Sequence, residues 1–387
     1  MENLRSKAAI VGLYEHPSRS MPGISPLQLR AECAINALAD AGLSMKDVDA
    51  LYCAGIPVEG GGMLLAEYLN LFPKIIDDTD IGGASFEAHV AHALANIAGG
   101  RCNVALITHG STNSSQGRAS GTRVGQRVPS NYPAGHLEAP FGLPTAGNYA
   151  LVAQRHMYQY GTKPEQLAEI AVATRDHASR NPHAKYRTPI TIEDVLNSRM
   201  IADPLHLLDC CVISDGGAAV VVASPEIARS CPKRPAWVLG VGEAARHTSM
   251  GQRDITYIAA AQSGKDAFAM AQVDHKDIDM CMLYDSFTIT VLCTVEDLGF
   301  CKKGEGGAFV EGGRLSLSGD LPTNTDGGAL SSNHPGRRGI FLLTEATRQL
   351  RGESTSQVPD CRIALCHGTG GLLGTRHSGA TVILGRD

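Results

Sequence analysis

The chain has 387 residues, of which 43% are hydrophobic and 19% are charged, a composition typical of a globular protein with a large buried core. Its formal net charge of -5 gives no basic surface, so we expect neither a nucleic-acid partner nor binding to anionic lipid. No apolar run approaches the roughly 20 residues that a membrane-spanning helix needs. The first apolar stretch, residues 8–13, is too short for a signal peptide, and we expect a cytoplasmic location.

Eleven cysteines are scattered along the chain, and none belongs to a C-x-x-C pair. This pattern supports neither a zinc site nor a redox motif. We therefore expect no bound metal and predict that the cysteines are reduced and mostly buried.

Short apolar runs and amphipathic segments alternate in the first part of the chain. They predict strand, helix, strand, helix and strand in that order, over residues 8–12, 27–41, 49–54, 86–97 and 104–108. Such alternation is typical of α/β proteins, and we expect largely parallel, buried strands.

Part of this order recurs further along the chain. Residues 37–53 are similar to residues 267–283. Residues 102–106 are similar to residues 361–365, and a His-Gly pair follows shortly after each of these two shorter segments. Two matches in the same order indicate an ancient duplication into two βαβ-rich halves. Chance similarity between amphipathic helices is the alternative.

Residues 113–200 differ in character from the rest of the first half. They are first polar and then helical and charged, which predicts an insertion of the kind that often supplies substrate-binding surface. We place the N-terminal half at residues 1–230, including this insertion, and the C-terminal half at residues 231–387.

A glycine-rich turn precedes the helix predicted at residues 86–97. Gly82 and Gly83 would let the backbone approach a ligand closely, and the start of the helix could stabilise an oxyanion. Ser85 follows in the same turn. The glycines could equally serve only the packing of the helix on the sheet.

Further polar side chains follow directly after apolar strands, where α/β proteins collect their sites. They are Tyr284 and Asp285 after the strand predicted at residues 280–283, His334 in a glycine-rich loop, and Cys366 with Gly368 after another strand. The imidazole titrates near neutral pH and the thiol not far above it, so both suit proton transfer. A core-edge tyrosine, a surface histidine and a buried cysteine are the alternatives.

At these residues the chain resembles the thiolase superfamily, most of all its sterol-carrier-protein (lipid-transfer-protein) type, over nearly its full length. NTDGGALSSNHPG is similar to the thiolase loop that ends in Gly-His-Pro, which puts His334 at the catalytic histidine. Cys366 and Gly368 resemble the C-x-G element, whose cysteine donates and accepts a proton, and YDSF occupies the place of N-E-A-F or H-D-x-F. The resemblance implies the thiolase fold, in which two duplicated halves form a layered αβαβα arrangement.

One difference from thiolases concerns the nucleophile. Thiolases carry a reactive cysteine at the turn before the first-half helix, and here no cysteine lies between Cys53 and Cys102. Gly83 takes that place or, with a shift of two, Ser85. Relatives without the cysteine look like aldolases of steroid side-chain breakdown; they carry a tyrosine where Tyr284 stands, but also replace the histidine that is kept here.

The resemblance and this difference predict a lyase that cleaves a β-hydroxyacyl-coenzyme A by a retro-aldol reaction, without an acyl-enzyme. Tyr284 and His334 would handle the hydroxyl proton, and Cys366 would reprotonate the α-carbon. The residues expected to hold the thioester are Gly82, Gly83, Ser85, Asp285 and Gly368. The alternatives are a thiolase or acyltransferase acting on β-ketoacyl-coenzyme A and a non-catalytic acyl-binding or scaffold subunit.

The resemblance also implies partners. A coenzyme A thioester is the expected substrate, and no covalently bound cofactor is expected. Thiolase-fold proteins form dimers, and relatives of this branch pair with a small zinc-ribbon/OB-fold protein that completes the acyl-coenzyme A site. The arginine-containing stretch 118–127 could contact the coenzyme A phosphates, with a solvated loop as the alternative.

Overall fold

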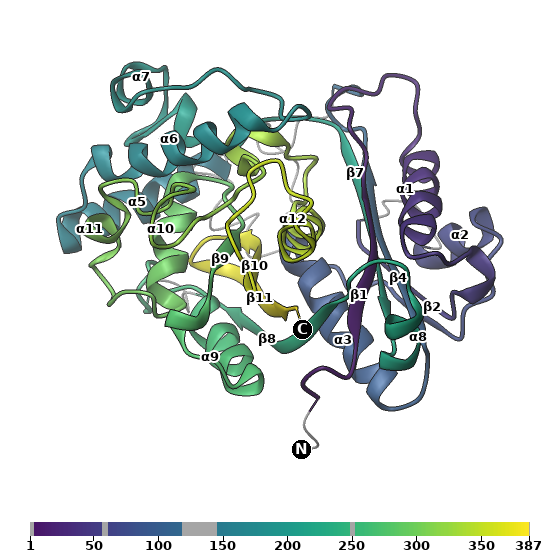
Figure 1. Cartoon of the computed structure of the whole chain (residues 1–387). Coiled ribbons are helices and arrows are strands. Elements are labelled where there is room, and N and C mark those ends of the chain that lie inside the picture. Colours follow the sequence, from purple (N-terminus) through teal and green to yellow (C-terminus); the bar gives the residue numbers. More distant parts are fainter. Residues whose placement is uncertain (1–3, 56–60, 118–144, 248–251, 387) are drawn as a thin grey trace.

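The computed structural model of the chain describes residues 4–55, 61–117, 145–247 and 252–386 (Figure 1). Its strands are β1 (Ala9–Glu15), β2 (Ala50–Cys53), β3 (Ile75–Asp77), β4 (Val104–Ser111), β5 (Met200–Ala202), β6 (Leu205–His206), β7 (Gly216–Ala223), β8 (Ala236–Arg246), β9 (Met280–Leu283), β10 (Ile363–Leu372) and β11 (Thr375–Gly385). Its α-helices are α1 (Pro26–Asp40), α2 (Gly61–Tyr68), α3 (Ser85–Ala98), α5 (Thr145–Tyr160), α6 (Pro164–Arg180), α7 (Ile192–Asn197), α8 (Pro225–Ser230), α9 (Ala260–Ala271), α10 (Thr288–Asp297), α11 (Gly306–Val310) and α12 (Gly339–Arg351). None of these described helices combines the length and the apolar character required to cross a bilayer.

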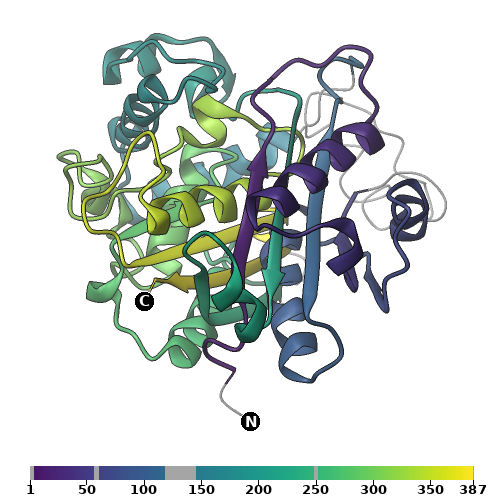
Figure 2. The same cartoon turned by 45° about the vertical axis from the view of Figure 1, so that its right-hand side comes forward.

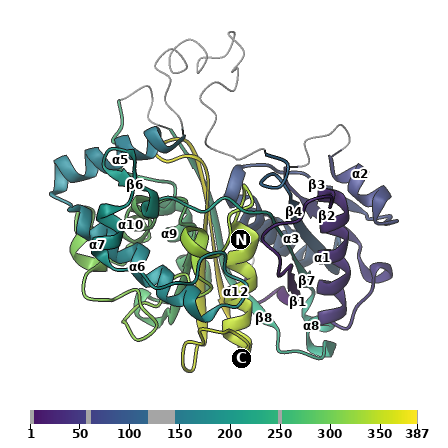
Figure 3. The ribbon, with the colours of Figure 1, turned by 90° about the horizontal axis from the view of Figure 1, so that it is seen from above.

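Nine of the described strands form one mixed sheet in the order β3-β2-β4-β7-β1-β8-β11-β10-β9. The pairing of β1 with β8 covers only two residue pairs, so two sheet halves meet at a narrow seam. Helices α3 and α12 lie between these halves and contact strands of both (Figure 3). Helix α1 covers the outer face of β1, β4 and β7, which run side by side in Figure 2, and α9 covers β8 and β11. The result is the five-layered α/β arrangement of helix, sheet, helix, sheet and helix.

The expectation of largely parallel strands was wrong. In the described sheet β1–β7, β1–β8, β4–β7, β8–β11 and β10–β11 pair antiparallel. Only β2–β3, β2–β4 and β9–β10 are parallel. Strands β2, β7 and β9 are nevertheless apolar and fully buried, because helices cover both faces of the sheet there. Their apolar runs therefore report burial on two sides, which parallel pairing often accompanies but does not require.

The two halves repeat one local design. Helix α1, a 3₁₀ turn and β2 correspond to α9, a 3₁₀ turn and β9. Asp49 accepts hydrogen bonds of 3.0 and 2.9 Å from two successive backbone N–H groups at the start of β4. Asp279 accepts equivalent bonds of 2.7 and 2.8 Å at the start of β10. This correspondence supports the duplication; the division at residue 230, between α8 and β8, stays a prediction.

The insertion predicted in the first half is largely helical where the structure describes it. Helices α5 and α6 follow the first-half strands in sequence but contact α10 of the other half, and α6 also contacts α11 (Figure 1). The insertion thus brings first-half sequence over the second half. The arginine-containing stretch expected to contact coenzyme A, residues 118–127, lies outside the described residues.

Candidate active site

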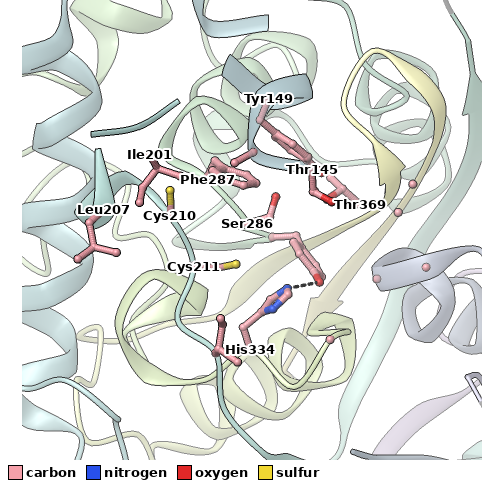
Figure 4. A pocket seen from close by; sticks show the side chains of 18 of the residues that line it. Thr145, Tyr149, Ile201, Leu207, Cys210, Cys211, Ser286, Phe287, His334 and Thr369 are labelled. Carbon is pink, nitrogen blue, oxygen red and sulfur yellow. Dashed lines mark hydrogen bonds between the residues drawn. The ribbon is translucent and has the colours of Figure 1, made fainter. Parts of the chain in front are cut away.

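A cavity of about 530 Å³ opens where the turn before α3 meets the ends of β9 and β10 and the start of α5. Four of the residues predicted from sequence line it, namely Gly82, Gly83, Tyr284 and His334. Other lining residues, shown in Figure 4, are Thr145, Tyr149, Ile201, Leu207, Cys210, Cys211, Ser286, Phe287 and Thr369. The wall is therefore mainly apolar, with a small group of polar side chains on one side.

Gly83 and Tyr284 share one space in this cavity. A Cβ atom added to Gly83 would lie 2.2 Å from Cε2 of Tyr284 and 2.5 Å from the carbonyl oxygen of Thr369. Both distances are far below van der Waals contact, so no side chain at residue 83 can coexist with this tyrosine position. The phenol ring occupies the place where a nucleophilic side chain at residue 83 would begin.

Tyr284 and His334 form a hydrogen-bonded pair at the cavity wall. Tyr284 follows β9, and its Oη lies 2.9 Å from Nε2 of His334 (Figure 4). The two rings are perpendicular, with centroids 5.7 Å apart. The backbone N–H of His334 donates to Oγ of Ser214 at 2.9 Å, which fixes the loop that carries the imidazole. Residues 50 positions apart in sequence thus meet in one dyad.

Burial sets the protonation states of this dyad. It raises the pKa of Tyr284 well above its ordinary value of 10.0. Burial and the nearby positive charge of Arg338 lower the pKa of His334 to about 4. At neutral pH the phenol is therefore protonated and the imidazole is neutral. It follows that Tyr284 donates its hydrogen bond to an unprotonated Nε2 of His334.

Asp285 does not line the cavity but supports the loop that carries His334. Its two carboxylate oxygens accept hydrogen bonds from the backbone N–H groups of Ala329 at 2.7 Å and Leu330 at 3.1 Å. These residues belong to a single wide turn, Gly328–Ser332, that leads into His334. Burial raises the pKa of Asp285 to about 7, against the opposing effect of Arg338. Asp285 is thus placed to position the imidazole rather than to touch a substrate.

Arg338 was not recognised from the sequence, although it is the centre of the charged group behind the dyad. It is fully buried, and its guanidinium donates to Asp326 at 2.6 Å and to the side-chain oxygen of Asn333 at 2.8 Å. Its Nε lies 3.6 Å from Asp285. A buried arginine needs such partners to offset the cost of burying its charge. The one sequence signal for its role was its position four residues after His334.

Besides Asp285, three further predicted site residues lie outside the cavity wall, namely Ser85, Cys366 and Gly368. The hydroxyl of Ser85 donates to the carbonyl of Gly82 at 2.7 Å and accepts from the N–H of Ile81 at 3.0 Å, so it stabilises the turn. Cys366 is fully buried, with Sγ 3.5 Å from the carbonyl oxygen of Leu342. Burial raises the pKa of this thiol well above its ordinary value. Gly368 lies on the same strand and faces α3.

The apolar wall was also missed from sequence. The rings of Tyr149 and Phe287 stack with centroids 4.3 Å apart at an interplanar angle of 31°. Tyr149 comes from α5, in the insertion, and Phe287 is the last residue of the YDSF segment. The sulfur of Cys211 points into the space between Ser286 and His334 (Figure 4). The sequence predicted only that the insertion would supply substrate-binding surface, without indicating Tyr149.

Comparison with known proteins agrees with this architecture. Residues 242–386 match the family model described as thiolase C-terminal domain-like. The chain is 36% identical to a steroid side-chain-cleaving aldolase of Thermomonospora curvata, over 96% of this chain and 97% of that protein. It is 36% identical to a 17-hydroxy-3-oxo-4-pregnene-20-carboxyl-CoA lyase of Mycobacterium tuberculosis, over 92% and 94%. It is also 34% identical to an acetyl-CoA acetyltransferase of Methanothermobacter thermautotrophicus, over 95% and 97%.

Solved structures show the same relationship. An Ltp2-ChsH2(DUF35) aldolase superposes with a TM-score of 0.89 at 34% identity, over 99% of both chains. Human mitochondrial 3-ketoacyl-CoA thiolase superposes with a TM-score of 0.73 at 16% identity, which shows the shared fold. The resemblance inferred from His334, Cys366 and the absent cysteine is thus confirmed at the level of the family. This chain belongs to the thiolase superfamily, in its aldolase-like branch.

Proposed function

We propose that this enzyme cleaves the carbon–carbon bond next to the thioester of a β-hydroxyacyl-coenzyme A by a retro-aldol reaction, without an acyl-enzyme. The observation that carries the proposal is the shared space of Gly83 and Tyr284. A cysteine side chain at residue 83 would overlap the phenol ring, whose nearest atom would be 2.2 Å from its Cβ. The ring instead presents a hydroxyl that is hydrogen-bonded to a neutral imidazole.

The dyad suits removal of the β-hydroxyl proton. The substrate hydroxyl gives its proton to Oη of Tyr284 while Tyr284 passes its own proton to Nε2 of His334. The substrate oxygen forms a carbonyl group, the Cα–Cβ bond breaks, and its electron pair enters the thioester as an enolate. Because the pKa of His334 is lowered to about 4, the imidazole is unprotonated at neutral pH, and its Nε2 is free to take this proton as the hydroxyl proton moves to Tyr284.

The enolate then needs stabilisation and a proton. Gly82 and Gly83 line the cavity at the N-terminus of α3, where backbone N–H groups and the helix dipole favour negative charge. Cys366, whose thiol is buried behind the cavity wall, supplies the proton: its S–H bond breaks as the α-carbon gains its C–H bond. Before the next turnover the thiolate regains a proton and His334 gives up the proton that it took from the hydroxyl. Ser85 and Asp285 hold the surrounding turns, and Gly368 gives α3 room to approach β10.

The carbonyl product is expected to be bulky and apolar. The stacked Tyr149 and Phe287 form a flat apolar wall in a cavity of about 530 Å³, a size that accommodates a polycyclic group. Two relatives of 36% identity carry names that specify a steroid side chain or a steroid-carboxyl-coenzyme A. We propose a steroid or aromatic acyl chain as the substrate class.

Two alternatives remain as outcomes of the same experiment. The acetyl-CoA acetyltransferase relative favours thiolysis or Claisen condensation, which would require a nucleophile other than residue 83. A non-catalytic acyl-binding or scaffold subunit would have no use for the dyad.

The test uses the purified chain with panels of β-hydroxyacyl- and β-ketoacyl-coenzyme A, followed by mass spectrometry. We expect a shortened acyl-coenzyme A and a ketone or aldehyde, formed without added coenzyme A. Two thioesters that form only with added coenzyme A would instead establish a thiolase. Binding without turnover of any substrate would indicate a non-catalytic acyl-binding or scaffold subunit.

A homodimer formed through the free edge of the sheet is proposed as the functional assembly. Strand β3 is the last strand at one end of the described sheet. Exposed apolar side chains gather beside it, with Met63 70% and Phe72 91% exposed. An unpaired strand edge with such neighbours favours pairing with a second copy. Sedimentation of Phe72→Glu against the unmodified chain tests this assembly.

A small second protein is proposed to complete the acyl-coenzyme A site in the cytoplasm. The structural relative of 34% identity is named as a complex, Ltp2-ChsH2(DUF35). The cavity mouth carries exposed Leu207 and Ile201, which a partner could cover. Cleavage assays with and without a zinc-ribbon/OB-fold protein of the same source would measure its contribution.

A further inference from the structure

Glu87 is a buried carboxyl group without a hydrogen-bond partner. It lies in the first turn of α3, four residues after Gly83, and no part of it is exposed. Neither of its carboxylate oxygens has a hydrogen-bond partner in the described structure. Burying an uncompensated carboxyl is costly, so this group calls for an explanation.

The surroundings of Glu87 are built to admit its carboxyl. A Cβ atom added to Gly368 of β10 would lie 2.2 Å from its Oε2, and one added to Gly339 of α12 would lie 2.3 Å from the same oxygen. The Cβ at Gly339 would also lie 2.3 Å from the carbonyl oxygen of Gly83. Two glycines on different elements thus leave space for this oxygen directly behind the turn that lines the cavity.

Glu345 shows how the same fold treats a structural buried glutamate. It lies in α12, the other central helix, and accepts hydrogen bonds from Thr325 at 2.7 Å, Ser354 at 2.6 Å and Gln349 at 3.1 Å. Glu87 accepts no hydrogen bond from another described residue, and burial raises its pKa to about 8, opposed only by its own backbone N–H. Glutamine would fill the same space without the cost of an ionisable group. A buried carboxyl with a raised pKa beside the cavity is a candidate for proton transfer.

Cys366 belongs to β10, the strand against which the carboxyl of Glu87 packs. Side chains two residues apart on a strand point to the same face, so the thiol lies on the face of β10 that Gly368 presents to Glu87. Oε2 of Glu87 lies 2.2 Å from the place of a Cβ atom at Gly368, two residues along the strand from Cys366, and a negative charge on Glu87 would raise the pKa of the thiol. Cys281 of β9 is the other thiol that contributes to this shift.

We propose that Glu87 stores the proton that Cys366 delivers to the enolate. The inference rests on the proposed retro-aldol function and adds a residue to it. The S–H bond of Cys366 breaks as the α-carbon gains its C–H bond. The thiolate then takes the proton of Glu87, so that an S–H bond forms and an O–H bond breaks. The carboxylate regains a proton from solvent after the products leave. Glu87 acts through Cys366 and does not touch the substrate.

The experiment separates reprotonation from carbon–carbon cleavage. Acetyl- and propionyl-coenzyme A are incubated with the unmodified chain in D2O, and deuterium at the α-carbon is followed by mass spectrometry. Glu87→Gln and Cys366→Ala are each expected to slow this exchange at least tenfold. The double variant is expected to be no slower than the slower single variant, because the two groups act in one path. Glu226→Gln, which changes an exposed glutamate in the first turn of α8, is the matched control.

The outcomes distinguish this inference from the proposed function. If the unmodified chain cleaves no β-hydroxyacyl-coenzyme A, the retro-aldol function itself fails. If the unmodified chain cleaves and Glu87→Gln exchanges deuterium at the unmodified rate, the retro-aldol function stands and the role of Glu87 is overturned. Glu87→Met, which lacks hydrogen-bonding oxygens, guards against an effect of amide geometry, and it should be as slow as Glu87→Gln. Thermal unfolding of each variant checks that the slow exchange does not come from loss of the fold.

Discussion

Two buried acidic groups flank the contact of Gly83 with Tyr284, and the fold treats them differently. Asp285, next to Tyr284, accepts two backbone hydrogen bonds and lies near the buried guanidinium of Arg338. Glu87, four residues after Gly83, has no partner in the described structure. The partnered group holds the geometry of the His334 loop, whereas the unpartnered group lowers stability. In the proposed mechanism, rigidity and proton supply therefore come from different residues of one site.

The largest expected effect comes from the dyad that both acids surround. Tyr284→Phe keeps the ring that fills the space at Gly83 and removes only the hydroxyl bonded to His334. We expect kcat/KM for β-hydroxyacyl-coenzyme A cleavage to fall by about 10³-fold, the usual weight of a general acid–base group. Tyr52→Phe is the matched control, because Tyr52 is a buried tyrosine of β2 whose hydroxyl is bonded to Asn96. A fall of less than tenfold for Tyr284→Phe would remove Tyr284 from the mechanism.

Removing the charge of Arg338, which lies near Asp285, should lower the stability of the fold. Arg338→Met leaves Asp326 and Asp285 as buried carboxylates without a cation, which lowers the free energy of unfolding by about 3–5 kcal/mol. Urea unfolding followed by circular dichroism measures the change. Arg180→Met removes an exposed arginine that pairs with Asp176 and should cost under about 1 kcal/mol. Equal costs for the two variants would contradict the role assigned to Arg338.

Removing the carboxyl group of Glu87 should instead raise the free energy of unfolding. The pKa of Glu87 is raised from 4.5 to about 8, so the unfolded chain loses this proton before the folded chain does. Stability is therefore lost as pH rises from about 4.5 to about 8, and it is regained below that window. Glu87→Gln should raise the free energy of unfolding by as much as about 3 kcal/mol at pH 7, with no gain at pH 4. A gain that does not depend on pH would mean that packing is responsible.

The contact between Gly83 and Tyr284 should give the smallest change in the free energy of unfolding. Gly83→Ala forces the ring of Tyr284 and the carbonyl of Thr369 to move, at a cost of about 1–3 kcal/mol. In a Tyr284→Ala background the same substitution should cost about 1 kcal/mol less, because only the carbonyl remains in the way. A double-mutant cycle from chemical unfolding measures this coupling. Strict additivity of the two substitutions would show that they do not compete for space.

Much of the fold could be predicted from the sequence because its signals are local. The strand expected at residues 280–283 is observed as β9, and the helix expected at residues 86–97 is observed as α3 with one further residue at each end. Strand direction was missed, because the apolar pattern of a strand records which faces are buried and not how its neighbours run. Pairing is decided by connections of many residues, such as the insertion between β4 and β7.

The candidate site could be predicted only where motif and strand end coincide. Tyr284 and His334 meet as expected, but Ser85 points into its own turn and Cys366 into the layer between the sheets. Spacing in sequence does not show which side of a turn a hydroxyl faces. The buried Arg338 and the wall residue Tyr149 were missed because their roles depend on contacts with distant segments.

The close approach of Gly83 to Tyr284 also limits how an enzyme of this kind can evolve by single substitutions. A chain that regained a cysteine at residue 83 would first lose its tyrosine position, and a chain that lost the tyrosine would still have no nucleophile. Each single substitution passes through a form with neither chemistry. Selection acting on one change at a time would therefore keep the two activities in separate lineages, even though the fold that supports them is the same.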